Sequence, residues 1–260
     1  MDEGSAAGSP ATRRVIVTGA ANGLGLAIAR RFASSSAKVL LVDRDPAVTS
    51  LPGTGSLGQL NTFALVKDIA DSDAADVVMR AALEALGSVD TLINNAAWSY
   101  HKPILDVCIS EFDRLIAINQ RTPFFLAQQF FKHISGLSRK PRDPCIINIA
   151  SVNALAGNPN LAAYAGTKGA LVAMGRAMAV EMAPLGIRVN CISPGAVDTP
   201  ATRRVFAEGI LDMNAMLENF LIKRLTLPEE IAELVFYLCS EAAACVTGAN
   251  WIIDGGYMAR

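Results

Sequence analysis

The stretch R-R-V-I-V-T-G-A-A-N-G-L-G-L-A-I-A-R-R-F, residues 13–32, decides the fold of this chain. Its β-branched start predicts a short buried strand that ends at Thr18. Three glycines follow, and apolar residues then recur at helical spacing up to Phe32. A strand, a glycine-rich turn and a helix in this order form a cradle for phosphate, because glycines let the backbone approach and the helix N-terminus offers unpaired N–H groups. The stretch therefore predicts an α/β fold that binds a pyrophosphate, the alternative being an ordinary glycine turn.

The rest of the chain continues the alternation of strands and helices. Six further apolar runs predict strands at residues 38–43, 62–66, 89–94, 146–150, 186–193 and 249–254. Helical patterns lie between them, at residues 74–86, 111–133, 164–182 and 228–238. Seven strands joined by helices on short connections imply a doubly wound, seven-stranded parallel sheet with helices on both faces. We expect a single-domain Rossmann fold over residues 13–260, preceded by a flexible tail of residues 1–12.

Composition narrows the class of protein. A chain of 260 residues with 52% hydrophobic and 18% charged residues has enough apolar side chains for one large core. The net charge of −1 gives no electrostatic footprint for nucleic acid or for an anionic membrane. No run of 18 apolar residues predicts a transmembrane helix, and the acidic start does not resemble a signal peptide. We therefore expect a cytoplasmic protein.

Cysteine and histidine usage argues against a metal site. The five cysteines are scattered, with no C-x-x-C pair, and the two histidines are far apart in the sequence. Neither a disulfide framework nor a zinc site is expected from such spacing.

An acidic residue at the end of the second predicted strand points to the kind of dinucleotide. Asp43 lies 18 residues after Gly25, close to the spacing at which a carboxylate hydrogen-bonds the adenosine ribose. A carboxylate there also repels a 2′-phosphate, which favours NAD over NADP. Arg44 is the contrary sign, because an arginine at this point can pair with a 2′-phosphate. The structural alternative is that Asp43 only ends the strand in a turn.

A serine, a tyrosine and a lysine form the candidate catalytic group. Ser151 follows a predicted strand, at the end where open α/β sheets build their sites. Tyr164 and Lys168 are four residues apart on a predicted helix and therefore share one face. A phenol has a pKa of about 10, and a neighbouring ammonium lowers that pKa by favouring the phenolate. The pair is thus expected to act as a tuned acid and base, the alternative being a helix tyrosine beside a solvated lysine.

Five short motifs occur in the order found in the short-chain dehydrogenase/reductase family, from about residue 13 to residue 256. They are T-G-A-A-N-G-L-G at 18–25, N-N-A-A at 94–97, Ser151 with Y-A-G-T-K at 164–168, P-G at 194–195 and D-G-G at 254–256. The chain resembles that family over nearly its whole length. It departs from the family at Ala97, which stands where the N-N-A-G motif has glycine.

The resemblance implies specific roles for residues of this chain. Four residues would be catalytic: Asn119, Ser151, Tyr164 and Lys168. Asn119 would bend its helix and hold a water in a proton relay. NAD would be bound by Gly19, Asn22, Gly23, Leu24, Gly25, Asp43, Asp68, Ile69, Asn95, Ala96, Tyr164, Lys168, Pro194, Gly195, Val197 and Thr199.

The function implied is hydride transfer between a secondary alcohol, or its ketone, and nicotinamide, with Tyr164 as acid and base. Two alternatives remain, a 3-oxoacyl (carrier protein or CoA) reductase and a non-catalytic dinucleotide sensor. The substrate would lie among three loops, residues 98–106, 153–160 and 200–225. In the last loop Arg203 and Arg204 either hold an anionic group or are solvated. The resemblance also implies a homotetramer, or a homodimer, formed through the two long helices and the last strand.

Overall fold

The computed structural model describes residues 12–54, 57 and 61–259. The tail predicted for residues 1–12 therefore falls outside the described residues, apart from its last residue. The described chain forms a seven-stranded sheet in the order β3-β2-β1-β4-β5-β6-β7, and every neighbouring pair is parallel. The strands are β1 (Arg14–Thr18), β2 (Lys38–Asp43), β3 (Thr62–Val66), β4 (Thr91–Asn94), β5 (Cys145–Ile149), β6 (Arg188–Pro194) and β7 (Asn250–Ile253). The predicted fold class is confirmed.

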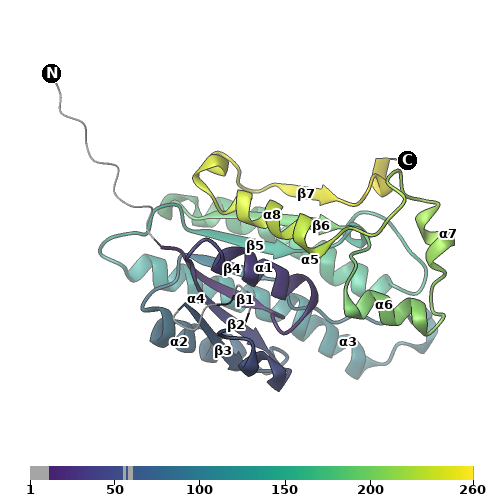
Figure 1. Cartoon of the computed structure of the whole chain (residues 1–260), viewed down its shortest axis with the longest axis horizontal. Coiled ribbons are helices and arrows are strands. Elements are labelled where there is room, and N and C mark those ends of the chain that lie inside the picture. Colours follow the sequence, from purple (N-terminus) through teal and green to yellow (C-terminus); the bar gives the residue numbers. More distant parts are fainter. Residues whose placement is uncertain (1–11, 55–56, 58–60, 260) are drawn as a thin grey trace.

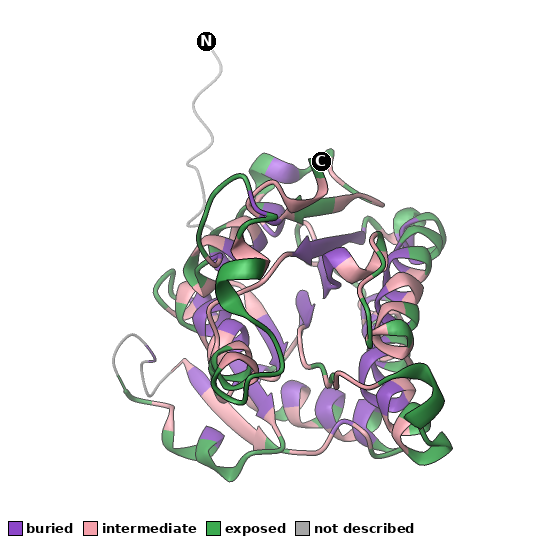
Figure 2. Cartoon of the chain, turned by 90° about the vertical axis from the view of Figure 1, so that its right-hand side faces the viewer, coloured by how far each residue is buried: buried purple, intermediate pink, exposed green. Residues whose placement is uncertain are grey.

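Helices cover both faces of the sheet, as expected for strands that are apolar on both sides (Figure 1). The helices α1 (Gly23–Ala33) and α8 (Pro228–Leu238) pack on one face. The opposite face is covered by α2 (Ala74–Leu86), α4 (Thr122–Gly136) and α5 (Ala162–Met182). Figure 2 shows the buried central strands between these two helical layers. The core is therefore two apolar layers, one on each side of the sheet.

The long helix predicted for residues 111–133 is interrupted in the structure. It consists of α3 (Ile109–Ile116), a π-helical turn over Ala117–Arg121, and then α4. Such turns insert an extra residue and redirect a helix, often at a functional site. Asn119 lies within this turn and is fully buried, so the helix departs from α-helical geometry at the residue where a bend was expected.

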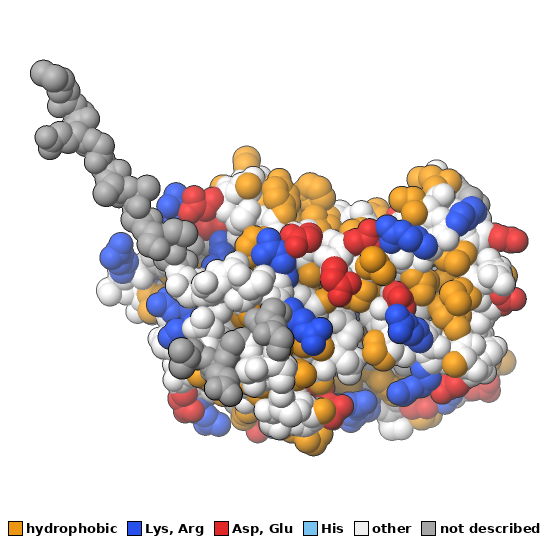
Figure 3. All heavy atoms as spheres, in the orientation of Figure 1, with side chains coloured by type: hydrophobic (Ala, Val, Ile, Leu, Met, Phe, Trp, Pro, Cys, Tyr) orange, Lys and Arg blue, Asp and Glu red, His pale blue; other side chains and the backbone are white. Residues whose placement is uncertain are grey.

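The segment after β6 extends away from the sheet and carries two short helices, α6 (Pro200–Ala207) and α7 (Met213–Leu217). Several of its large apolar side chains are exposed, among them Ile210, Leu221 and Ile222, although Phe220 is only 3% exposed. In Figure 3 hydrophobic side chains gather at this end of the molecule. The segment is therefore a cover at the edge of the fold and not part of the two core layers. Among the described residues, no helix is both long enough and apolar enough to cross a bilayer.

Candidate active site

The candidate site lies at the carboxyl ends of the strands, where the chain order of the sheet reverses. From β1 the chain proceeds through β2 to β3 on one side, and it returns to place β4 on the other side of β1. Loops leaving β1 and β4 in opposite directions open a crevice between them, which is where open α/β sheets bind ligands. The predicted glycine turn follows β1, and the N-N-A-A motif follows β4.

The glycine turn is built so tightly that two of its glycines are sterically required. Gly19 has a φ of +68°, a region that side chains with a Cβ rarely adopt. A Cβ on Gly25 would lie 2.0 Å from the carbonyl oxygen of Gly19. The turn therefore brings the start of α1 against the end of β1, with Asn22 as an exposed N-cap residue and Leu24 buried beneath it.

The motif after β4 holds this turn in place. The Asn95 amide Nδ2 donates to the carbonyl oxygens of Thr18 at 2.8 Å and Gly19 at 3.2 Å. The backbone N–H groups of Asn95 and Ala96 both donate to the Thr18 hydroxyl at 3.0 Å. The side chain of Asn95 thus shapes the cradle, a role that the local motif alone does not reveal.

Asp43, the last residue of β2, faces the same turn. Its Oδ2 accepts a hydrogen bond of 2.9 Å from the backbone N–H of Ala21, and its Oδ1 accepts one of 3.0 Å from Asp45. The carboxylate therefore lies beside the glycine turn, and its neighbour Arg44 is exposed. These bonds give Asp43 a structural role in the turn. Its position beside the glycine turn is also compatible with the predicted role in binding the adenosine ribose.

Asp68 and Ile69 follow β3 at the next strand end. The Asp68 carboxylate accepts a hydrogen bond from the Ala70 N–H at 2.9 Å and forms an ion pair with Arg114 of α3 at 2.8 Å. Burial alone would raise the pKa of Asp68, but these two partners bring it below its ordinary value. Asp68 is thus a charged, oriented group at the rim of the crevice, while Ile69 is buried.

The candidate catalytic residues converge from β5 and α5. Ser151, two residues after β5, is buried and shares a side-chain hydrogen bond with the hydroxyl of Tyr164. Lys168, one turn along α5, is only 2% exposed and donates to the carbonyl oxygen of Ile149 at 2.7 Å. Its Nζ lies 5.7 Å from the centre of the Tyr164 ring. A hydroxyl, a phenol and an ammonium are therefore adjacent at one strand end.

The electrostatics of this group differ from the sequence-based expectation. Burial raises the pKa of Tyr164 to about 12, and the hydrogen bond with Ser151 offsets only part of that rise. Burial also lowers the pKa of Lys168 to about 8. The expected lowering of the tyrosine pKa by Lys168 is wrong for the protein alone, because desolvation of the phenol outweighs attraction by an ammonium that hydrogen-bonds elsewhere.

Asn119 joins this group through α5. Its Nδ2 donates to the Thr167 hydroxyl at 3.1 Å and to the Trp98 carbonyl oxygen at 2.8 Å, and its Oδ1 accepts from the Trp98 N–H at 2.9 Å. Thr167 lies between Tyr164 and Lys168 in the sequence. Asn119 therefore ties the loop after β4 to the helix that carries the candidate acid and base.

The P-G motif at the end of β6 closes the crevice from the other side. The Gly195 N–H, which follows Pro194, donates to the carbonyl oxygen of Ile253 at 3.0 Å. The Thr199 hydroxyl accepts from the Thr202 N–H at 3.2 Å and so caps α6. A Cβ on Gly23 would lie 3.3 Å from Thr199, which brings this segment against the glycine turn. Val197 forms a bridge with Thr226 beside it.

The predicted residues thus come together around the carboxyl ends of the strands, and known proteins share both the sequence and the fold. Residues 19–258 match a sequence family described as enoyl-(acyl carrier protein) reductase. The chain is 32% identical to cyclopentanol dehydrogenase of Comamonas testosteroni over 251 residues, covering 95% of this chain and 97% of that protein. The chain belongs to the short-chain dehydrogenase/reductase family. The named relatives are dehydrogenases and reductases, and the chain is an oxidoreductase of this family.

Solved structures of family members superpose on nearly the whole chain. A 4-hydroxyisoleucine dehydrogenase complexed with NADH has a TM-score of 0.86 and 30% identity, covering 96% of this chain and 100% of that one. A 3-ketoacyl-(acyl-carrier-protein) reductase from Brucella melitensis, also complexed with NADH, has a TM-score of 0.86 and 34% identity, covering 96% and 99%. Relatives with one fold therefore act on chemically different substrates.

Of the three loops that we expected to border the substrate of this family member, the first two contact each other, and the third packs against Tyr257, whose hydroxyl donates to Asn158 of the second. The Lys102 N–H donates to the Asn160 carbonyl oxygen at 2.9 Å, which joins the first loop to the second. The Phe220 ring, in the third loop, lies 5.5 Å from the ring of Tyr257. Arg203 pairs with Asp198 at 2.6 Å on an exposed surface, which favours the solvated interpretation of that arginine.

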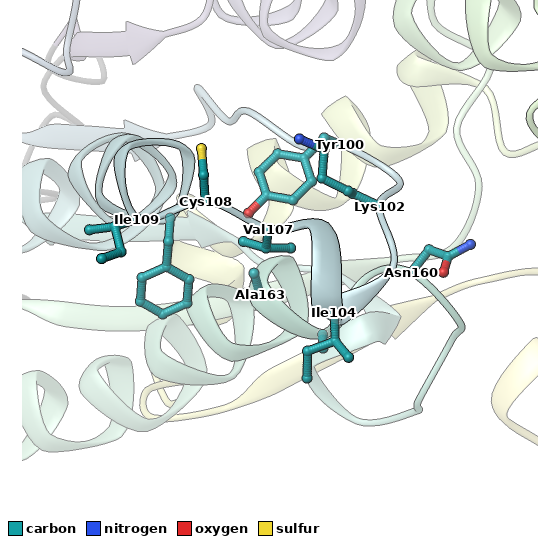
Figure 4. Close-up of a pocket in the computed structure, with 10 residues that line it drawn as sticks. Tyr100, Lys102, Ile104, Val107, Cys108, Ile109, Asn160 and Ala163 are labelled. Atoms are coloured by element: carbon teal, nitrogen blue, oxygen red, sulfur yellow. The ribbon is translucent and has the colours of Figure 1, made fainter.

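A cavity of about 410 Å³ lies between the first loop and the start of α5 (Figure 4). Its walls are mostly apolar and include Ile104, Val107 and Ala163. The Tyr100 hydroxyl is buried there without a hydrogen-bond partner among the described residues, and burial raises the pKa of this tyrosine. None of the four candidate catalytic residues is among the residues that line this cavity, although Ala163 directly precedes Tyr164.

Sequence analysis did not single out three residues that are linked in series to the candidate catalytic serine by hydrogen bonds. Asn153 donates to the Ser151 hydroxyl, Asn158 donates to Asn153, and the Tyr257 hydroxyl donates to Asn158. The available signal was the unusual run N-A-L-A-G-N-P-N at residues 153–160, which carries three asparagines directly after the serine.

Proposed function

We propose that this protein is an NAD-dependent dehydrogenase that interconverts a secondary alcohol and its ketone, with Tyr164 as the acid and base. The observation that carries the proposal is the meeting of Ser151, Tyr164 and Lys168 at the end of β5, beside the crevice that the glycine turn lines. A buried hydroxyl, a half-buried phenol and a buried ammonium close to one another provide a hydrogen-bond donor, a proton carrier and a positive charge.

The residues around the crevice fit a nicotinamide dinucleotide. The absent Cβ atoms of Gly19 and Gly25 let the turn pack tightly against the start of α1 and against Asn95 and Ala96, and the N-terminus of α1 favours the negative charge of a pyrophosphate. Asp43 lies where a carboxylate would hydrogen-bond the ribose and repel a 2′-phosphate, which supports NAD. The NADH-bound relatives support the same class of cofactor.

In the proposed mechanism the bound nicotinamide supplies or accepts the hydride, and the protein handles the proton. Ser151 hydrogen-bonds the substrate oxygen and holds it near the phenol. For reduction, Tyr164 donates its proton to that oxygen, and for oxidation it accepts the alcohol proton. Lys168 stabilises the phenolate that reduction leaves behind, which offsets the penalty of forming that charge in a buried position. Asn119 anchors α5 and the loop after β4, so that the reacting groups stay aligned.

A 3-oxoacyl reductase remains the second candidate. The same residues would reduce the 3-keto group of a 3-oxoacyl thioester to a hydroxyl, and the Brucella reductase of that description is 34% identical to this chain. Because that structure is complexed with NADH, a preference for NAD does not separate the two candidates. The two candidates are separated by comparing the turnover of a hydroxyacyl thioester with the turnover of simple secondary alcohols.

The proposal is tested by following nicotinamide absorbance with NAD and with NADP across secondary alcohols, cyclic diols, sugars and hydroxyacyl thioesters. We expect NAD-linked oxidation of one group, which also names the substrate class. Tight binding of NADH without turnover of any compound would instead favour a dinucleotide sensor.

We also propose that the protein assembles as a homotetramer or homodimer and acts in the cytoplasm. Exposed aromatic side chains support the assembly, Phe124 and Phe125 on α4 and Trp251 on β7. Multi-angle light scattering is expected to give a mass of two or four chains, and a monomer at micromolar concentration would contradict the assembly.

A further inference from the structure

A chain of side-chain hydrogen bonds leads from the C-terminal segment to the candidate catalytic serine. The Tyr257 hydroxyl donates to Asn158 Oδ1 at 3.0 Å, and Asn158 Nδ2 donates to Asn153 Oδ1 at 2.7 Å. Asn153 Nδ2 then donates to Ser151 Oγ at 3.2 Å. Each amide therefore accepts at its oxygen and donates at its nitrogen, and the chain has one consistent direction that ends on the serine.

The serine receives two hydrogen bonds from the same asparagine. Besides Nδ2, the backbone N–H of Asn153 donates to Ser151 Oγ at 3.2 Å, as the N-cap bond of the short helix Val152–Ala154. A serine hydroxyl has two acceptor positions and one proton. With both acceptor positions used by Asn153, the serine proton has to point toward a different partner.

We propose that Asn153 is a positioning residue that commits Ser151 to donating its proton toward the substrate oxygen, and that Asn158 and Tyr257 hold Asn153 in that orientation. The inference rests on the proposed function. A donor fixed in advance stabilises the charge that develops on the substrate oxygen without reorganising during the reaction. The donors behind it polarise the serine hydroxyl further, since hydrogen bonds in a chain strengthen one another.

The outer end of this series of hydrogen bonds, Tyr257, also contacts the segment after β6 that covers the edge of the fold. Tyr257 belongs to the short C-terminal helix Tyr257–Ala259, and its ring packs against Phe220 after α7. A change in the cover that moves Tyr257 would therefore alter how firmly Asn158 and Asn153 are held. The effect on Ser151 is expected to weaken with each step away from it.

The test uses the substrate found for the wild-type protein and measures kcat, KM and NADH affinity. Asn153→Ala should lower kcat about tenfold, the size of one hydrogen bond to a developing charge, with NADH affinity within about twofold of wild type. When Asn153→Ala is added to a Ser151→Ala protein, kcat should fall by no more than about a further twofold, because the hydroxyl through which Asn153 acts is gone. Tyr257→Phe should lower kcat by a few-fold at most.

A second variant separates this role from simple support of the loop. Asn153→Asp keeps the shape of the side chain, but its ionised carboxylate only accepts hydrogen bonds and so draws the Ser151 proton away from the substrate. Its kcat should fall at neutral pH and recover as the pH is lowered toward the carboxylate pKa, a profile that wild type does not show. A loop-support role predicts no such recovery.

The outcomes distinguish the two proposals. Wild-type turnover with an unchanged Asn153→Ala kcat, or an equal loss in the Ser151→Ala background, would overturn this inference and leave the proposed function intact. Absence of wild-type turnover with every alcohol and ketone would overturn the proposed function and this inference with it. If Asn153→Ala does not fold, as judged by its melting curve, the Asn153→Asp pH profile decides the question.

Discussion

Charged groups are buried at both ends of the parallel strands, but within the described chain they have oppositely charged partners only at the amino ends. At the amino ends, the largely buried Arg188 and Asp143 pair at 2.6 Å, and Arg13 joins them at 3.1 Å from the same carboxylate. At the carboxyl ends, Lys168 is as deeply buried, yet no carboxylate of the described chain lies within ion-pair distance of it. A buried charge without an opposite partner costs stability. The difference supports the proposal that the carboxyl ends carry the chemistry, while the ion pairs at the amino ends stabilise the fold.

The largest expected effect is on the proton carrier at the carboxyl ends. Tyr164→Phe removes the phenolic proton and should lower turnover by a factor of about 10³ or more, near the upper range for one acid or base. Binding of NADH, followed by fluorescence, should change little. Tyr237→Phe on the exposed face of α8 is the control and should leave turnover unchanged. Substantial turnover by Tyr164→Phe would rule out its role.

At the amino ends, breaking an ion pair should affect stability and not chemistry. Arg188→Met leaves a buried carboxylate with one partner fewer and should lower the free energy of unfolding by about 3–5 kcal/mol, measured with urea. The kcat of the folded protein should stay close to wild type. Arg203→Met, which breaks an exposed pair with Asp198, should cost less than about 1 kcal/mol. Similar losses for the two variants would contradict the contrast between buried and exposed pairs.

Cofactor choice gives a smaller effect at the carboxyl ends. Asp43→Ala removes the proposed ribose ligand and should reduce the NAD over NADP ratio of kcat/KM by about ten- to a hundredfold. Asp43→Asn keeps an acceptor for the Ala21 N–H and removes the charge, so it isolates the repulsion of a 2′-phosphate. An unchanged ratio in both variants would assign Asp43 to the turn alone.

The pH dependence should be the mildest effect. Below a pH of about 8 Lys168 is an ammonium, and above it the group loses its charge. Because the pKa of Tyr164 is about 12, the phenol keeps its proton throughout this range. The rate of ketone reduction should therefore fall as pH rises from 7 to 9, by up to about tenfold, as Lys168 deprotonates. A reduction rate that rises over this range would contradict the assignment.

The sequence could predict the features that local patterns encode. The strand Lys38–Asp43 and the helix Ala74–Leu86 are found with the predicted bounds, because apolar runs and helical periodicity are local signals. The glycine turn was equally readable, since a tight turn against a helix demands residues without a Cβ.

Features that depend on distant partners could not be predicted in the same way. The π-helical turn around Asn119 is stabilised by Trp98 and Thr167, which are 21 and 48 residues away in the sequence. The raised pKa of Tyr164 depends on how deeply the folded chain buries the phenol. The bond between Asn158 and Tyr257 spans 99 residues. Such contacts appear only after the strand ends and their loops have been brought together.

The contrast between the two ends of the strands is tested most directly by the free energy of unfolding of Lys168→Met, determined together with its turnover. If Lys168 is retained for chemistry, replacing a buried unpaired ammonium by an apolar side chain of similar length should leave stability unchanged or raise it, while turnover is lost. A loss of several kcal/mol, as expected for Arg188→Met, or turnover close to wild type would contradict the account.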